Sequence, residues 1–304
     1  MLTGAQDQLL TLQQRNTFRN SRRSVLKAEF RHFLSNPIFF IEASRILSGI
    51  SKIVSIRPFP KIGFEFDFCR ANGLKIVVLE TRISRILSNA KFSESRILIL
   101  TRDERFAKRL ISLEKKILNG KLDFEKGRRK LIMLEGKLFG YPDCCSKAYA
   151  KSKTSLPLET KLIIDAIERG IFSQLILGLR KSQILSFPQF FTLNFYPCEA
   201  DCKRAERVGL KIKRSLGEFG FVFSLRTMLN ALYLLRIAYK SAHHSGILSK
   251  VAREFLKTLK KEELEMIEAV AEVDYEEFSN NFIRSLMKRY YDRSGREHNS
   301  DWDG

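Results

Sequence analysis

The sequence has no apolar run long enough to span a membrane. A spanning helix needs about 20 consecutive apolar residues, whereas the longest runs here, 219–225 and 229–235, are interrupted or ended by Ser224, Arg226 and Arg236. The N-terminus is polar and basic and lacks the apolar segment of a secretory signal. We therefore expect a soluble, cytoplasmic protein with no membrane span, whose cysteines meet a reducing compartment.

Several catalytic motifs are also missing. The chain contains no Gly-x-Gly-x-x-Gly after a strand, no Gly-x-x-x-x-Gly-Lys-Ser/Thr, no His-Glu-x-x-His and no Cys-x-x-x-Cys-x-x-Cys. Each of these patterns supplies a specific phosphate cradle, zinc site or cluster. Their absence leaves nucleotide-dependent and radical chemistry without support.

Acidic residues are scarce relative to basic ones. The 304 residues include 54 Lys and Arg against 34 Asp and Glu, which gives a formal charge of +20. Such an excess favours a polyanionic partner, and we expect nucleic acid, such as a tRNA, ahead of an anionic membrane; scattered lysines on a solvated surface are the simpler alternative. The cations expected to bind it follow the second cysteine motif: Lys203, Arg204, Arg207, Lys211, Lys213 and Arg214.

Four of the five cysteines form two pairs, Cys144 with Cys145 and Cys198 with Cys202. Each pair follows a proline and precedes helix-compatible sequence, so both are predicted at helix starts, where the partial positive charge of the helix end stabilises thiolate. Four soft ligands in this pattern predict a zinc ion or an iron–sulfur cluster. Adjacent cysteines diverge on a regular helix or strand, so one ion would require an unusual turn at Asp143, whereas a cluster relaxes that constraint.

Three alternatives to this metalloprotein hypothesis stay open. The cysteines could be small core residues, or form two disulfides with one cysteine from each pair. A metal-free enzyme could use a helix-start cysteine as nucleophile or redox thiol. The centre could also be purely structural.

Other candidate residues carry weaker signals. Asp143 and Asp201 are the carboxylates proposed as acid–base groups or as hydrogen-bond partners of the centre; Asp165 and Glu199 are expected to be ordinary acids of helix first turns. Cys69 is expected in the core. The histidines are not expected to bind metal: His243 and His244 are adjacent on a predicted helix, and His32 and His298 stand alone.

The hydrophobic pattern predicts an α/β protein of α+β type, with a small mixed sheet, covering helices, cysteine motifs at helix starts and a helical C-terminal region. Strands are expected at 62–68, which forms a hairpin with 74–79, and at 96–100 and 190–196; helices are expected over 1–55, near 83–87, and at 103–118, 119–138 and 159–169. The predicted units are a basic helical segment (1–56), a core with the cysteines (57–217), a helical region (218–292) and a disordered tail (293–304).

The two cysteine motifs resemble those of an uncharacterised archaeal family, domain of unknown function 483. The likeness covers roughly 57–217, and the matching positions are Leu138, Gly140, Tyr141, Pro142, Cys144 and Cys145 in the first motif and Pro197, Cys198, Cys202 and Ala205 in the second. Ser146 stands where a larger apolar residue is expected, and Tyr196 where a small residue or histidine is expected. The resemblance implies an archaeal cytoplasmic protein defined by four cysteines; it implies no activity.

Overall fold

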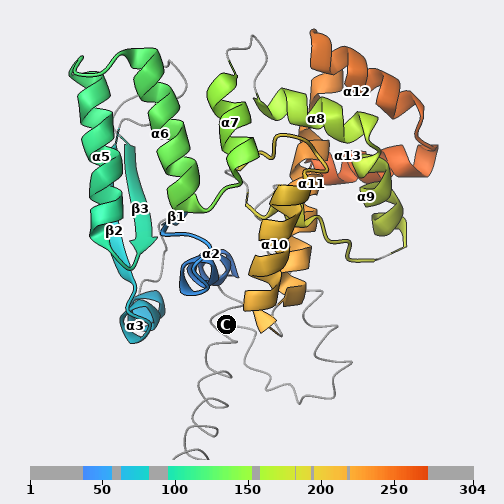
Figure 1. Cartoon of the computed structure of the whole chain (residues 1–304). Helices are drawn as coiled ribbons and strands as arrows, with labels where there is room; N and C mark the ends of the chain where they lie inside the picture. Colours follow the sequence, from blue (N-terminus) through green and yellow to red (C-terminus); the bar gives the residue numbers. More distant parts are fainter. Residues whose placement is uncertain are drawn as a thin grey trace, which may run out of the picture.

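A computed structural model of the chain describes residues 37–56, 63–81, 95–152, 158–181, 183–192, 195–217 and 220–272. Figure 1 shows a small sheet with its helices at one side, a group of helices at the other, and α2, α7 and α10 between them. The predicted α+β class is confirmed. The predicted N-terminal helix before residue 37, the helix near 83–87 and the tail after 292 lie outside the described residues.

The sheet has three strands in the order β1-β3-β2, and both pairings are antiparallel, so the sheet is not mixed. Its strands are β1 (Ile53–Ile56), β2 (Lys75–Thr81) and β3 (Ser95–Thr101). The strands predicted at 74–79 and 96–100 are confirmed, whereas β1 was missed inside the expected N-terminal helix. Thr101 at the end of β3 pairs with Ile53 on one side and Lys75 on the other.

The strand predicted at 62–68 is wrong, because its described residues, 63–68, belong to helix α3 (Gly63–Ala71). The alternating phenylalanines suggested a strand with one buried face. In the structure Phe66 is 47% exposed, while Glu65 and Cys69, four residues apart, are buried. The buried positions therefore follow helical spacing.

Helices α5 (Glu104–Leu118) and α6 (Phe124–Phe139) cover the sheet (Figure 1). Asp103 caps α5 by accepting a hydrogen bond from the backbone N–H of Arg105 at 2.9 Å. Buried side chains of α5 and α6, including Leu110 and Leu131, pack with Ile53 and Ile99 of the strands. The helices predicted at 103–118 and 119–138 are confirmed, the second with a later start.

The opposite group consists of helices and has its own apolar core. Its members are α8 (Leu158–Glu168), α9 (Ile171–Arg180), α11 (Gly220–Ala242), α12 (Ile247–Lys257) and α13 (Lys261–Glu272). Helix α11 is long and apolar enough to cross a membrane, but 72% of its apolar window is buried inside the protein. This burial is typical of a core helix in a soluble protein.

A third core joins the two groups. It is formed by α2 (Pro37–Leu47), the start of α7 (Asp143–Lys151), α10 (Lys203–Ser215) and the start of α11, together with the four cysteines at or just before the beginnings of α7 and α10. The strand predicted at 190–196 is wrong: the short 3₁₀ helix η1 (Pro188–Phe190) occupies its start, and the described residues after it are irregular. Two side chains of α11 bind the backbone around η1. The hydroxyl of Thr227 accepts a hydrogen bond from the N–H of Phe187, and the amide of Asn230 donates one to the carbonyl of Phe190.

The turn that leads into the first cysteine pair is fixed by the N-terminal part of the chain. Gly140 ends α6 with φ 72°, and a Cβ at this position would lie 2.2 Å from the carbonyl oxygen of Ile50. The carbonyl of Phe139 accepts hydrogen bonds from the buried guanidinium of Arg45 and, at 2.7 Å, from the hydroxyl of Ser51. Helix α2 and the segment after it therefore determine where the chain enters α7.

We expect Gly140→Ala to destabilise the protein more than Gly170→Ala, measured as the free energy of unfolding in denaturant. Both glycines have left-handed φ, 72° and 69°, but an added Cβ meets nothing within 4 Å at Gly170. Conformational strain alone costs about 1 kcal/mol in both variants. The clash with Ile50 should raise the loss in Gly140→Ala to roughly 3 kcal/mol; equal losses would show that the contact with Ile50 does not constrain the turn.

Candidate metal centre

The first cysteine pair lies in the first turn of α7. Cys144 and Cys145 follow Asp143 directly, and Pro142 precedes the helix. Their Sγ atoms are 3.7 Å apart although the residues are adjacent. Side chains on a helix tilt towards its N-terminus, so neighbouring residues of the first turn can both reach a point beyond the helix end. The expectation that adjacent cysteines diverge from one site therefore does not hold here.

The second pair lies at the start of α10. Cys202 is the residue before the helix, as predicted, whereas Cys198 lies four residues earlier in a turn closed by a hydrogen bond of 3.1 Å from the N–H of Cys202 to the carbonyl of Glu199. The N–H of Cys198 points at the sulfur of Cys145, at 3.4 Å. The turn thus brings the second pair against the first.

The four sulfur atoms form one compact group. Cys202 lies 3.8 Å from Cys144, 3.7 Å from Cys145 and 3.6 Å from Cys198 between Sγ atoms. All four Sγ atoms lie within 4.8 Å of one another. Each described cysteine is a free thiol, so the alternative of two disulfides is not the arrangement in this structure.

The sulfurs experience different electrostatic environments. Burial raises the pKa of Cys145, and it raises the pKa of Cys198 to about 12. Burial also acts to raise the pKa of Cys202, but hydrogen bonds from the N–H groups of Ala205 and Arg204 and from the Cys198 thiol outweigh it, so the pKa of Cys202 lies below its ordinary value. The start of α10 thus stabilises thiolate at one member of the group.

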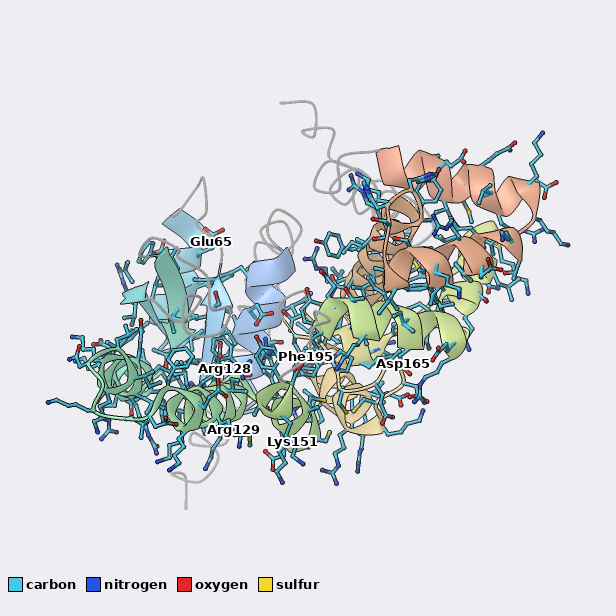
Figure 2. The ribbon with its side chains drawn as sticks, turned by 90° about the horizontal axis from the view of Figure 1, so that it is seen from above. Glu65, Arg128, Arg129, Lys151, Asp165 and Phe195 are labelled. Atoms are coloured by element: carbon cyan, nitrogen blue, oxygen red, sulfur yellow. The ribbon has the colours of Figure 1, made fainter. Side chains whose placement is uncertain are left out.

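Hydrogen bonds from neighbouring elements hold the second cysteine turn. Asp165 on α8 accepts from the N–H of Ala200 at 2.5 Å, and Gln189 of η1 donates to the carbonyl of the same residue at 2.9 Å. Arg169 binds Asp165 at 2.6 Å and Asp201 at 2.7 Å. Asp165 therefore bridges α8 to the turn between Cys198 and Cys202 (Figure 2).

Aromatic rings and one buried arginine support the first pair. Tyr141 stacks on Phe139 and Phe195, with ring centroids 5.6 and 4.6 Å apart. The guanidinium of Arg45, only 1% exposed, lies 5.8 Å from the ring centroid of Tyr141 and forms an ion pair with Glu42. Burial of a cation this deep requires such partners.

The carboxylates proposed from sequence lie at the rim of the centre. Asp143 is the exposed first residue of α7, and Asp201 faces Arg169 instead of the sulfurs. The sequence prediction missed Arg45, Arg169 and Gln189 and assigned no bridging role to Asp165. No sequence pattern identifies these residues, because they approach the cysteines only in the folded protein; Arg45, for example, is far from both motifs in the chain.

The remaining candidates behave as ordinary residues. Cys69 is buried in the core, where burial raises its pKa to about 11, and it is not a member of the four-cysteine group. His243 and His244 are exposed at the end of α11 and are likewise not members of that group. His32 and His298 lie outside the described residues.

The basic residues predicted on α10 lie on its solvent side. Ala205, Gly209 and Ile212 face the core, whereas the cations are exposed or, for Lys213, half-buried. Lys203 pairs with Glu206 at 3.0 Å. Within the described part of the chain, no ion pair engages the other five: Arg204, Arg207, Lys211, Lys213 and Arg214.

Comparison with known proteins gives one match. Residues 96–230 match the family described as "Protein of unknown function (DUF483)". The search of curated proteins and the search of solved structures each found no match. Both cysteine motifs, α7 and α10 lie inside the matched segment, whereas α2 with Arg45 lies before it. Over residues 96–230 the chain is therefore similar to the DUF483 family, whose function is unknown.

Proposed function

We propose that Cys144, Cys145, Cys198 and Cys202 bind one zinc ion, and that this centre fixes a nucleic-acid-binding module. The separation of the sulfurs carries the proposal. A tetrahedral ion with metal–sulfur bonds of about 2.3 Å places its ligands about 3.8 Å apart. Four of the sulfur pairs are 3.6 to 3.8 Å apart.

An iron–sulfur cluster fits the same distances poorly. The thiolates of an iron–sulfur cluster are shared among separate iron atoms, so thiolates on different irons lie farther apart than the ligands of one ion. The sulfur atoms here all lie within 4.8 Å of one another. A single ion with four thiolates is also the arrangement typical of closed, structural zinc sites.

The position of the centre supports a structural role for the metal. Its ligands come from α7, which follows the sheet-covering helices, and from the start of α10, which contacts η1 and α11 of the helical part. Zinc would therefore join the two halves of the protein through metal–sulfur bonds that contribute far more to the free energy of folding than surface contacts do. In the purely structural alternative the same ion fixes the fold and no polyanion binds.

The nucleic-acid part of the proposal rests on α10. This helix carries six cations and one acidic residue, and Cys202 immediately precedes it. A row of exposed Lys and Arg binds phosphates and releases counterions, which supplies affinity without sequence preference. Anchoring α10 through the metal would hold this row rigidly.

A metal-free enzyme is the second candidate, favoured by the lowered pKa of Cys202. A nucleophilic thiolate must also reach its substrate, and Cys202 is only 7% exposed. The two hypotheses differ in thiol chemistry. A reactive cysteine alkylates rapidly and alone, whereas a metal centre protects all four thiols until a chelator removes the ion.

For protein purified without oxygen, we expect one zinc ion per chain and no acid-labile sulfide, measured by elemental analysis and sulfide assay. Iron together with sulfide would instead support a cluster. A protein without metal whose thiols all react freely would contradict the proposal and favour the reactive-cysteine enzyme.

Substituting Cys145 or Cys202 by serine should abolish stoichiometric zinc and lower the free energy of unfolding by about 3 kcal/mol or more, because each sulfur is a bond to the ion. Cys69→Ala is the matched control, since Cys69 is equally buried but lies outside the cluster. It should keep its zinc and lose only about 1 kcal/mol. Full zinc occupancy in either serine variant would show that the ligands are different.

Neutralising α10 should weaken nucleic-acid binding and its dependence on salt. In Arg207→Gln/Lys211→Gln, the slope of log affinity against log salt should become shallower by about 2, because two phosphate contacts are lost. Binding of fluorescent RNA and DNA, measured by anisotropy over a salt series, tests this. Binding indifferent to salt, or no binding at low salt, would contradict a role for these cations.

A further inference from the structure

We propose that the nucleic-acid surface extends beyond α10 to α6 and α7, and that it binds the phosphate backbone of a duplex on both sides of the cysteine centre. This inference rests on the proposed function. It adds which helices contact the nucleic acid and that the nucleic acid is double-stranded. The basic face is defined here by six exposed cations: Arg129 of α6, Lys147 and Lys151 of α7, and Arg204, Arg207 and Lys211 of α10.

The α10 part of the basic face belongs to a regular row that Arg214 extends. Arg204, Arg207, Lys211 and Arg214 are separated by three, four and three residues, so they share one side of the helix. The row runs about 15 Å along the helix axis. One strand of a duplex places a phosphate about every 3.4 Å along its axis, so the row can meet several phosphates.

The α6 and α7 part of the basic face lies on the same edge of the molecule. Figure 2 shows Arg129 and Lys151 projecting from α6 and α7 on the side away from the sheet and α2, along an edge that α10 continues. Both residues are exposed, as is Lys147. Within the described residues, no acidic side chain forms an ion pair with any of the three.

Two close contacts hold the three helices in fixed relation. Helices α6 and α7 approach so tightly that a Cβ at Gly136 would lie 2.0 Å from the hydroxyl of Ser146. The starts of α7 and α10 meet at the cysteines, where the sulfurs of Cys145 and Cys202 are 3.7 Å apart. The cations on α7 and α10 therefore form one preorganised surface, which lowers the entropy lost on binding.

The composition of the face favours a duplex over a single strand. Proteins that hold single strands stack the bases on exposed aromatic rings. Helix α10 has no aromatic residue, and Tyr149, the single aromatic residue of α7, is partly buried. Phe124 of α6 is exposed, but it lies five residues before Arg129, about 140° around the helix, and therefore on another side of α6. A row of cations with no exposed ring on the same side of its helices suits phosphates displayed by a paired helix, which both duplex RNA and duplex DNA provide.

The test compares three variants that each lose two positive charges. Arg129→Gln/Lys151→Gln changes the α6–α7 part, Arg207→Gln/Lys211→Gln changes α10, and Lys250→Gln/Lys260→Gln removes exposed cations on and just after α12, far from the face (Figure 1). Binding to duplex RNA, duplex DNA and a single strand of matched sequence is measured by anisotropy over a salt series, after elemental analysis has verified equal metal content.

We expect Arg129→Gln/Lys151→Gln to lose roughly 10- to 100-fold in duplex affinity at 0.1 M salt and about 2 units of salt slope, while Lys250→Gln/Lys260→Gln matches the unaltered protein. The ratio between duplex RNA and duplex DNA then identifies the source of the phosphates.

If only the α10 variant weakens, the α6–α7 part is not in the interface; this overturns the inference and leaves the proposed function. Tighter binding of the single strand than of either duplex also overturns it. If the unaltered protein binds none of the three ligands at low salt, the nucleic-acid function itself fails.

Discussion

The structure depends on one constraint: the four cysteine sulfur atoms lie close together although they belong to two separate segments of the chain. Cys144 and Cys145 arrive at the start of α7, and Cys198 and Cys202 arrive before α10. Cys144, Cys145 and Cys202 lie at helix N-termini, where side chains point beyond the helix end and backbone N–H groups face sulfur, whereas Cys198 lies in the turn before α10. Because α7 belongs with the sheet side and α10 with the helical side, this meeting point determines how the two sides of the protein are joined.

Each cysteine pair depends on a polar support that lies elsewhere in the chain. Arg45 of α2 holds the end of α6 and the ring of Tyr141, which sets the turn before Cys144. Asp165 of α8 and Arg169, which follows that helix, hold the turn before Cys202. Breaking the buried ion pair of Arg45 with Glu42 is costly because the remaining charge stays unpaired. The geometry of the sulfurs is therefore imposed by the fold around them, and a bound ion would find the site largely preorganised.

The sequence was sufficient to predict the group of four cysteines but not its surroundings. Cysteine spacing and the prolines before each pair identify the four sulfurs and the starts of α7 and α10, since these are local signals. The strand predicted at 190–196 fails because Thr227 and Asn230 of α11 satisfy the backbone around η1, which is a tertiary effect. The strand predicted from the alternating phenylalanines at 62–68 fails for a related reason, because tertiary packing buries Glu65 and Cys69 and leaves Phe66 exposed. The supports from Arg45 and Asp165 leave no sequence pattern at all.

X-ray absorption at the edge of the bound metal is the sharpest test of a single four-thiolate ion, because it reports the ligand atoms and their distances without depending on activity. For protein loaded with zinc, we expect one shell of four sulfur atoms at about 2.3 Å. A shell that contains nitrogen or oxygen would show that one of the four cysteines is not a ligand. In protein that retains iron from its host, a second shell from a neighbouring iron would identify a cluster and contradict the single tetrahedral ion.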